Sequence, residues 1–108
     1  MSASDSFYDK TTAINQMWQT DFTYFKILGW GWYYLSTILD DFSRYIIHWE
    51  LCSTMKADDV MQTVERAMQK TGLSEKNPPK LLSDNGACYI SKDLAEYLGE
   101  WNIKHVRG

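Results

Sequence analysis

The stretch Met17–Ile27 decides the fold expected of this chain, and it reads MWQTDFTYFKI. Its aromatic and β-branched residues suit a pleated surface, and its side chains alternate between two faces as in a β-strand. Gly29-Trp30-Gly31 interrupts the pattern, and Trp32–Leu39 then resumes an apolar, β-rich run. Because the two glycines can take positive φ, the sequence predicts a β-hairpin here.

A third strand and a helix are predicted beyond this hairpin. A polar break at Asp40–Ser43 precedes a further β-rich run, Arg44–Leu51, which would complete an antiparallel meander. From Ala57 to Thr71 the apolar residues recur at helical spacing, with aspartates near the start and Gly72 placed to cap the end. The change of period predicts an amphipathic helix after the meander.

The remaining segments alternate between strand and helix. Pro78-Pro79 bars continuation of the helix, and the short apolar run Lys80–Ser83 is typical of a buried central strand. Ser91 is placed to cap a second helix, and Asn102–Arg107 could begin a fifth strand. The order βββαβαβ predicts an α/β fold with a mixed five-stranded sheet flanked by helices.

Two aspartates lie where such a sheet would bring them together. Strands that follow helices run parallel to a neighbour, so pairing of Lys80–Ser83 with Met17–Ile27 would place Asp84 beside Asp21. Two carboxylates about 5 Å apart repel by roughly 3 kcal/mol, and Mg²⁺ or Mn²⁺ would relieve this cost. The alternative is an edge aspartate facing solvent and an ordinary turn residue.

Composition bounds the class of protein. Hydrophobic residues make up 44% of the chain and aromatic residues 15%, which indicates a globular domain. The net charge of −3 argues against a stand-alone nucleic-acid binder, so DNA binding would need metal ions or a separate basic domain. No apolar run approaches the roughly 20 residues of a membrane span, and Met1–Lys10 lacks the features of a secretory signal. We expect a cytoplasmic protein without membrane association.

Other polar residues have structural interpretations. Asp40 and Asp41 are expected to act as turn or capping residues rather than as metal ligands. His48 lies within an apolar strand and is expected to be a satisfied core or surface histidine. Cys52 and Cys88 are far apart with no CxxC motif, which favours buried reduced thiols over a zinc site.

Two further groups leave alternatives open. Trp30 and Trp32 are either core residues or, near a hairpin tip, exposed residues that mark a partner surface. Lys104, His105 and Arg107 are candidate phosphate contacts, although solvated surface is the more common role of such charges.

Three motifs in order carry a resemblance to a known family. Asn15–Tyr24 (NQMWQTDFTY), Leu39–Arg44 (LDDFSR) and Leu82–Gly86 (LSDNG) resemble the integrase-core segment of bacterial insertion-sequence transposases, of which retroviral integrases are more distant relatives. The resemblance extends from about Asn15 to Gly108. It implies an RNase H-like fold whose first three strands are antiparallel. It also implies metal-dependent DNA strand cleavage and strand transfer by an Asp-Asp-Glu triad.

The resemblance assigns two of the three triad positions. Asp21 in Thr-Asp-Phe matches the first carboxylate of the family, and Asp84 in Ser-Asp-Asn-Gly matches the second, which makes both catalytic and metal-binding candidates. The third, a glutamate on a later helix, would lie beyond Gly108, and Glu96 and Glu100 are too close to the second aspartate to replace it. We therefore expect a DDE polynucleotidyl transferase core that is inactive alone, whether it is an excised piece or a truncated product.

The resemblance also implies domains, cofactor and partners. Residues 1–14 are expected to form a polar N-terminal lead and residues 15–108 an integrase-like core, incomplete at its C-terminal end. The intact parent would hold Mg²⁺ or Mn²⁺ in a two-ion site, bind transposon ends and target DNA, form a homo-oligomer, and associate with the nucleoid when on DNA. Two alternatives remain open: an RNase H-like nuclease that only hydrolyses, and a non-catalytic assembly module.

Overall fold

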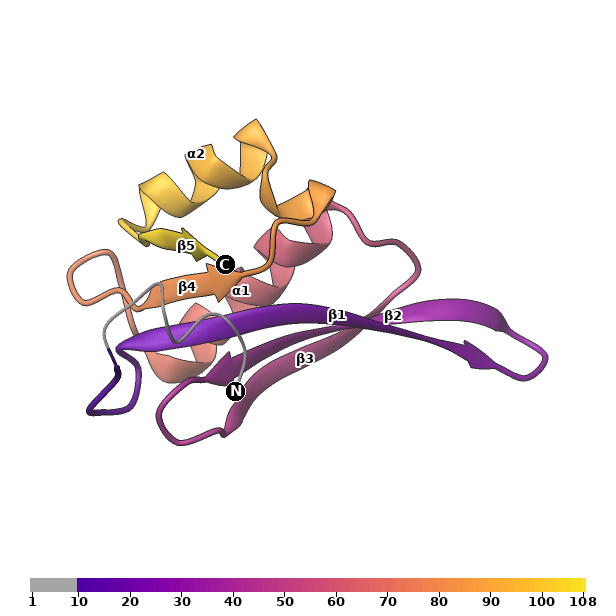
Figure 1. The fold of residues 1–108 in the computed structure, drawn as a ribbon, viewed down its shortest axis with the longest axis horizontal. Helices are drawn as coiled ribbons and strands as arrows, with labels where there is room; N and C mark the ends of the chain where they lie inside the picture. Colours follow the sequence, from indigo (N-terminus) through magenta and orange to yellow (C-terminus); the bar gives the residue numbers. More distant parts are fainter. Residues whose placement is uncertain (1–9) are drawn as a thin grey trace.

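The structure is a computed structural model that describes residues 10–108. Three strands come first, followed by alternating helices and strands (Figure 1). In chain order the elements are β1 (Met17–Ile27), β2 (Gly31–Asp40), β3 (Ile46–Cys52), α1 (Ala57–Thr71), β4 (Lys80–Ser83), a 3₁₀ turn η2 (Ala87–Tyr89), α2 (Lys92–Glu100) and β5 (His105–Arg107).

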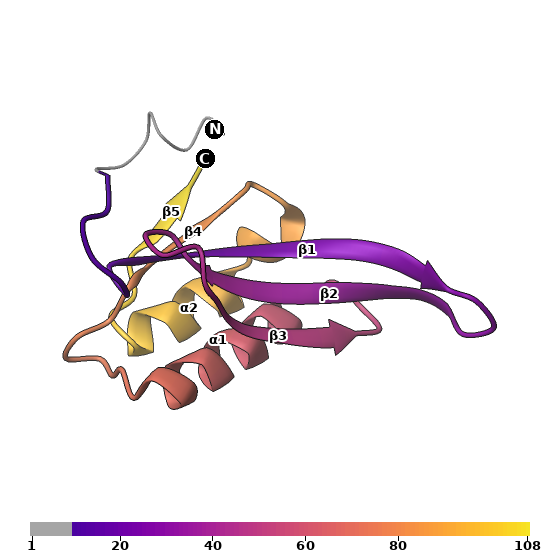
Figure 2. The ribbon, with the colours of Figure 1, turned by 90° about the horizontal axis from the view of Figure 1, so that it is seen from below.

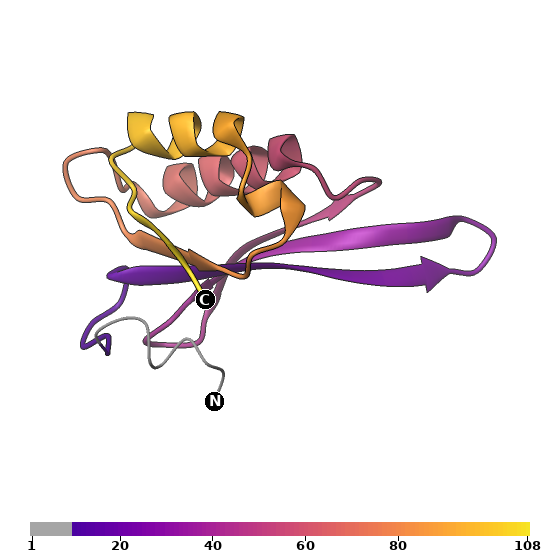
Figure 3. The ribbon, with the colours of Figure 1, turned by 45° about the horizontal axis from the view of Figure 1, so that its top comes forward.

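The strands form one mixed sheet in the order β3-β2-β1-β4-β5. β1 pairs antiparallel with β2, and β2 antiparallel with β3, whereas β4 runs parallel to both β1 and β5. The predicted α/β class, the antiparallel meander and the parallel later strands are therefore confirmed. Both helices lie on the same face of the sheet, and the opposite face carries no helix in the part of the chain that is described (Figure 3).

The core fills the space between the sheet and the two helices. Trp18 and Ile38 contribute from the first two strands and are fully buried. Because α1 presents its apolar residues on one side, these side chains pack on the same cluster. The remaining buried members are Val60, Val64, Ala67, Met68, Leu81, Tyr89, Leu94, Leu98 and Ile103.

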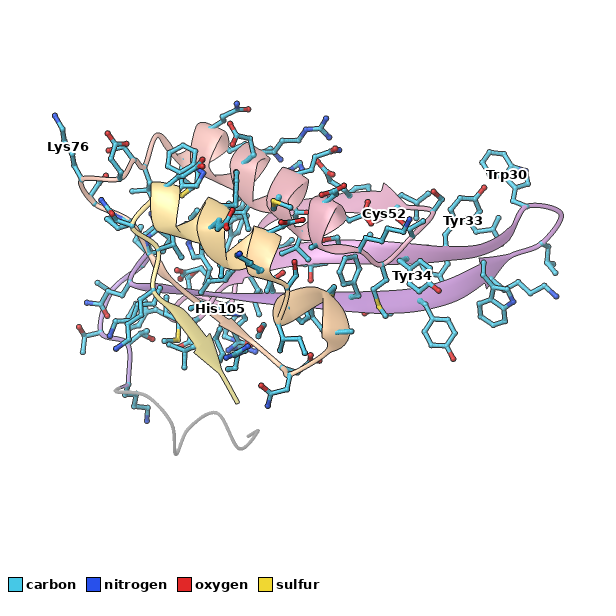
Figure 4. The ribbon with its side chains drawn as sticks, turned by 90° about the horizontal axis from the view of Figure 1, so that it is seen from above. Trp30, Tyr33, Tyr34, Cys52, Lys76 and His105 are labelled. Atoms are coloured by element: carbon cyan, nitrogen blue, oxygen red, sulfur yellow. The ribbon has the colours of Figure 1, made fainter. Side chains whose placement is uncertain are left out.

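The β1–β2 hairpin extends well beyond the rest of the sheet as a projecting arm (Figures 1 and 2). Trp30 lies at its tip, at the opposite end of the molecule from Lys76 (Figure 4). Trp30 and Trp32 are 71% and 57% exposed, so the exposed alternative for this tryptophan pair is the correct one. Tyr24 stacks against Trp32 and Tyr34, with ring centroids 5.2 and 6.1 Å apart.

Both predicted helix caps are present. The N–H of Gly72, which has φ 73°, donates to the carbonyl of Met68 and ends α1. The hydroxyl of Ser91 accepts hydrogen bonds from the N–H groups of Asp93 and Leu94 and begins α2.

Two strand starts were predicted too early, in both cases because a residue adopts a left-handed turn. Arg44 has φ 65°, which is incompatible with a strand, so β3 begins at Ile46 instead of Arg44. Asn102 has φ 59° and follows the end of α2, so β5 begins only at His105.

The segment before β1 contacts the turn between β2 and β3. Thr11 donates a hydrogen bond to Asp41 at 2.8 Å, and the N–H of Asn15 donates to Asp40 at 2.7 Å. Residues 1–9 of the predicted polar lead lie outside the described part of the chain. Among residues 10–108 no helix is long and apolar enough to cross a membrane.

Candidate active site

Pairing between β1 and β4 brings the two candidate aspartates to one place. The parallel register matches Met17 with Lys80, Trp18 with Leu81 and Gln19 with Leu82. Asp21 lies two residues beyond the last of these pairs on β1, and Asp84 lies two residues beyond it at the end of β4. The two side chains line the same pocket, as expected from the sequence.

Backbone hydrogen bonds orient both carboxylates. Asp21 Oδ1 accepts a hydrogen bond from the N–H of Phe22 at 2.9 Å, and Asp84 Oδ1 accepts one from the N–H of Gly86 at 2.7 Å. A Cβ atom at Gly86 would lie only 3.0 Å from Asp84 Oδ1, so a larger residue there would require the carboxylate to shift by a few tenths of an ångström. In each aspartate the second carboxylate oxygen carries lone pairs that a cation can use.

The electrostatics of the pair favour neutralisation. Burial raises the pKa of Asp21, and the negative charge of Asp84 raises it further, although the hydrogen bond from Phe22 acts in the opposite direction. A carboxylate whose pKa is raised by a neighbouring carboxylate gains from a proton or a cation at the same position.

The pocket around the pair is open and mixed in character, with a volume of about 450 Å³. Thr37 from β2 lies opposite Asp21 in the β1–β2 register, and its hydroxyl donates to the Asp21 carbonyl at 3.4 Å. Of the described residues that line the pocket, Arg44 alone is cationic. Within residues 10–108 the lining consists of Gln19, Thr20, Asp21, Thr37, Leu39, Arg44, Leu82, Ser83, Asp84 and Gly108.

No third acidic side chain joins the pair within the described residues. Glu96 and Glu100 lie exposed on α2 and do not line the pocket, as predicted from their spacing. Within residues 10–108 no group of three His, Cys, Asp or Glu side chains could hold a metal ion.

Asp40 and Asp41 have the structural roles that the sequence predicted. Asp40 is 2% exposed, and its carboxylate accepts hydrogen bonds from both the N–H and the hydroxyl of Ser43 at 2.8 Å. Asp41 accepts a hydrogen bond from Gln19 at 2.6 Å. The two residues therefore shape the β2–β3 turn beside the pocket.

The candidate phosphate contacts at the C-terminal strand do not line the pocket. His105 lies on β5 (Figure 4), where its Nε2 atom and the hydroxyl of Ser83 are 2.7 Å apart. Burial lowers the pKa of His105, and the charge of Arg107 lowers it further. Lys104 and Arg107 are exposed.

A buried cluster around Glu50 was not predicted. Glu50 on β3 is 8% exposed and accepts hydrogen bonds from Gln62 and Arg66 on α1, while His48 Nε2 lies 2.9 Å from its Oε1 atom. Burial acts to raise the pKa of Glu50, but the hydrogen bonds from His48, Arg66 and Gln62 outweigh it and lower this pKa. The cluster joins α1 to the sheet outside the pocket. His48 is largely buried, and its Nε2 atom contacts Glu50.

The cysteines do not form a disulfide or a metal site. Both thiols are free; Cys52 is buried and Cys88 is half-buried. Burial raises the pKa of Cys52 to about 11, and Asp59 and Glu50 raise it in the same direction, so the thiol stays protonated. Free, protonated thiols agree with the predicted reduced state of the cysteines.

Comparison with known proteins gives consistent matches. The family model for the integrase core domain matches residues 11–108. A relative named as a transposase for insertion sequence element IS986/IS6110 from Mycobacterium tuberculosis is 30% identical over 95 residues, which cover 85% of this chain and 34% of the relative. Transposase InsF for insertion sequence IS3A from Escherichia coli is 29% identical over 92 residues, covering 83% of this chain and 30% of the relative. The chain thus spans about a third of these relatives.

Solved structures share the fold. The HTLV-2 integrase catalytic core domain in complex with magnesium has a TM-score of 0.73 and 24% identity, over 88% of this chain and 61% of that one. A simian T-cell lymphotropic virus intasome chain has a TM-score of 0.74 and 23% identity, over 87% of this chain and 32% of that one. These likenesses support the RNase H-like architecture that was predicted. From its match over residues 11–108, this chain belongs to the integrase core domain family.

Proposed function

We propose that this chain is the catalytic-core part of a transposase that cleaves DNA and joins DNA strands, using divalent metal held by Asp21 and Asp84. The observation that carries the proposal is the parallel β1–β4 pairing, which places both carboxylates in one pocket. The names of the transposase relatives agree with this function.

The residues present fit a hard divalent cation. Mg²⁺ and Mn²⁺ prefer oxygen ligands and bind through one or two carboxylates together with phosphate oxygens. Asp21 and Asp84 supply two such carboxylates. Burial raises the pKa of Asp21 and the charge of Asp84 adds to it, and a cation between the carboxylates would offset both effects. Magnesium accompanies the integrase core of HTLV-2 in its solved structure, which agrees with the same choice of ion.

The chemistry follows from in-line displacement at phosphorus. In two-metal sites the ions activate the attacking oxygen and stabilise the leaving oxygen. Asp21 and Asp84 would hold the metal charge next to the scissile phosphodiester. The backbone N–H groups of Phe22 and Gly86 fix the orientation of the two carboxylates. A further carboxylate is needed for turnover, and residues 10–108 do not place one at the pocket.

DNA and a second copy of the chain are the proposed partners. The net charge of −3 opposes DNA binding, so bound cations or a basic segment of a longer protein must offset it. Ile46, Trp49 and Leu51 on β3 are 52%, 59% and 46% exposed. Trp49 pairs with Thr37, which pairs with Asp21, so this apolar surface shares the helix-free face of the sheet with the aspartate.

We infer that a homo-oligomer buries the apolar surface formed by Ile46, Trp49 and Leu51. Light scattering at micromolar protein concentration should give more than the mass of one chain, and Trp49→Lys should lower that mass. A monomer at this concentration would reject the inference.

Thermal unfolding with and without about 10 mM Mn²⁺ tests the metal site. If the ion binds with a dissociation constant near 1 mM, linkage predicts about 1.4 kcal/mol of stabilisation, or several degrees in Tm. Asp21→Asn and Asp84→Asn should each abolish the shift, whereas Glu96→Gln, which removes an exposed charge on α2, should retain it. A shift that survives in both aspartate variants would contradict the site.

A second experiment tests the type of reaction, and it uses a longer protein that also supplies a third carboxylate to the pocket. Labelled transposon-end DNA would be incubated with target DNA and Mg²⁺, and the products separated by size. Joined strands support a transposase, cleavage without joining supports a hydrolytic nuclease, and metal-independent assembly without either product supports a non-catalytic module.

A further inference from the structure

Among residues 10–108, Arg44 is the one cation that lines the pocket of the two aspartates. It lies between β2 and β3, on the far side of β2 from β4 and Asp84. Its side chain is 54% exposed. The pocket therefore combines two carboxylates with a single accessible guanidinium.

The backbone at this position is unfavourable for arginine. Arg44 has φ 65°, a left-handed conformation that glycine or asparagine adopts more readily. Its N–H donates to the carbonyl of Asp40 at 2.9 Å, and the buried Asp40 carboxylate holds Ser43 one residue earlier. The surrounding turn thus enforces the conformation, and a strained residue maintained in this way is typical of functional positions.

Within the described residues, a weak ion pair with Asp41 holds the Arg44 side chain. Arg44 Nη1 lies 3.8 Å from Asp41 Oδ1, which is too long for a hydrogen bond. That same Asp41 oxygen accepts a hydrogen bond from Gln19, another residue of the pocket wall. The contact keeps the guanidinium near the pocket while leaving its paired N–H donors able to bind a planar or tetrahedral anion.

We propose that Arg44 is a phosphate-binding residue that holds a DNA phosphodiester next to the one positioned at Asp21 and Asp84. The proposal rests on the proposed function and extends it by assigning a second point of contact for the same strand. Arginine suits this role because its fork of donors matches two phosphate oxygens. The contact also offsets part of the repulsion between the acidic pocket and the DNA backbone.

Arg44→Gly is the most informative variant, because it removes the side chain and relieves the left-handed backbone strain. DNA affinity would be measured by fluorescence anisotropy with a short labelled duplex in Mn²⁺, over a series of salt concentrations. We expect about tenfold weaker binding and a plot of log affinity against log salt that is shallower by about 0.9. The Tm of the variant should be equal to or above that of the wild type.

Two further variants separate geometry from charge. Arg44→Lys keeps the charge but loses the paired donors, so its affinity should lie between those of the wild type and Arg44→Gly. Lys76→Ala removes an exposed cation between α1 and β4 that does not line the pocket (Figure 4), and it should leave the salt dependence unchanged.

The Mn²⁺-dependent rise in Tm distinguishes this proposal from the metal site on which it rests. We expect Arg44→Gly to retain that rise, since the two aspartates are intact. An unchanged affinity and salt dependence in Arg44→Gly, or no DNA binding by the wild type, would overturn the phosphate-binding role. A wild-type Tm that does not rise with Mn²⁺ would instead refute the metal site.

Discussion

Replacing Asp21 by asparagine should stabilise the metal-free protein. Adjacent strands lie about 5 Å apart, and two unit charges at that distance repel by roughly 3 kcal/mol at an effective dielectric of 20. Both carboxylates reach solvent, which screens them, so we expect a gain of about 0.5–1 kcal/mol. The Tm should rise by roughly 2–8 °C. The asparagine oxygen can still accept the hydrogen bond from Phe22.

The effect should depend on pH in a defined direction. The folded pKa of Asp21 lies above its ordinary value of 3.8, so between these two pKa values the folded state binds more protons than the unfolded state. The wild type therefore gains stability relative to Asp21→Asn as the pH falls through the folded pKa, and the difference between the two proteins should shrink there.

Differential scanning calorimetry in EDTA, at pH values from 7 down to 4, measures both predictions. Glu96→Gln serves as the control, because it removes one negative charge from α2 at a position outside the pocket. A metal-free Asp21→Asn protein no more stable than the wild type at pH 7 would refute the argument that the two carboxylates repel each other.

Three other substitutions test particular contacts. Gly86→Ala should weaken Mn²⁺ binding about tenfold in titrations followed by Tm. The added Cβ displaces the Asp84 carboxylate, which accepts a hydrogen bond from the N–H of residue 86. An unchanged affinity would show that the carboxylate tolerates the shift. Ser91→Ala should cost about 1 kcal/mol in urea unfolding through loss of the α2 cap, and no loss would mean that water replaces it. His105→Asn should flatten the pH dependence of Tm between pH 8 and 5. The folded pKa of His105 lies below its ordinary 6.5, so the wild type loses stability as the pH falls through that window. Identical pH profiles of the two proteins would contradict this.

Most of the fold could be predicted from local patterns. Met17–Ile27 alternates at the period of a strand and Ala57–Thr71 has apolar residues at helical spacing, and both segments have the predicted bounds in the structure. The strand starts at Arg44 and Asn102 were predicted wrongly, because a left-handed residue inside a β-rich or polar run leaves no signal in composition. Such a conformation depends on contacts such as the one between Arg44 and Asp40.

The sequence by itself determined the element order, the helix caps and the identity of the two candidate aspartates, because periodicity, capping residues and short motifs are local properties. Only the tertiary structure decided that Asp21 and Asp84 share a pocket, that Arg44 joins them and that Glu50 collects three partners from β3 and α1. Except for His48 and Glu50, these groups are far apart in the chain. The pairing of β1 with β4 brings the two aspartates together, and the packing of α1 on the sheet brings Gln62 and Arg66 to Glu50.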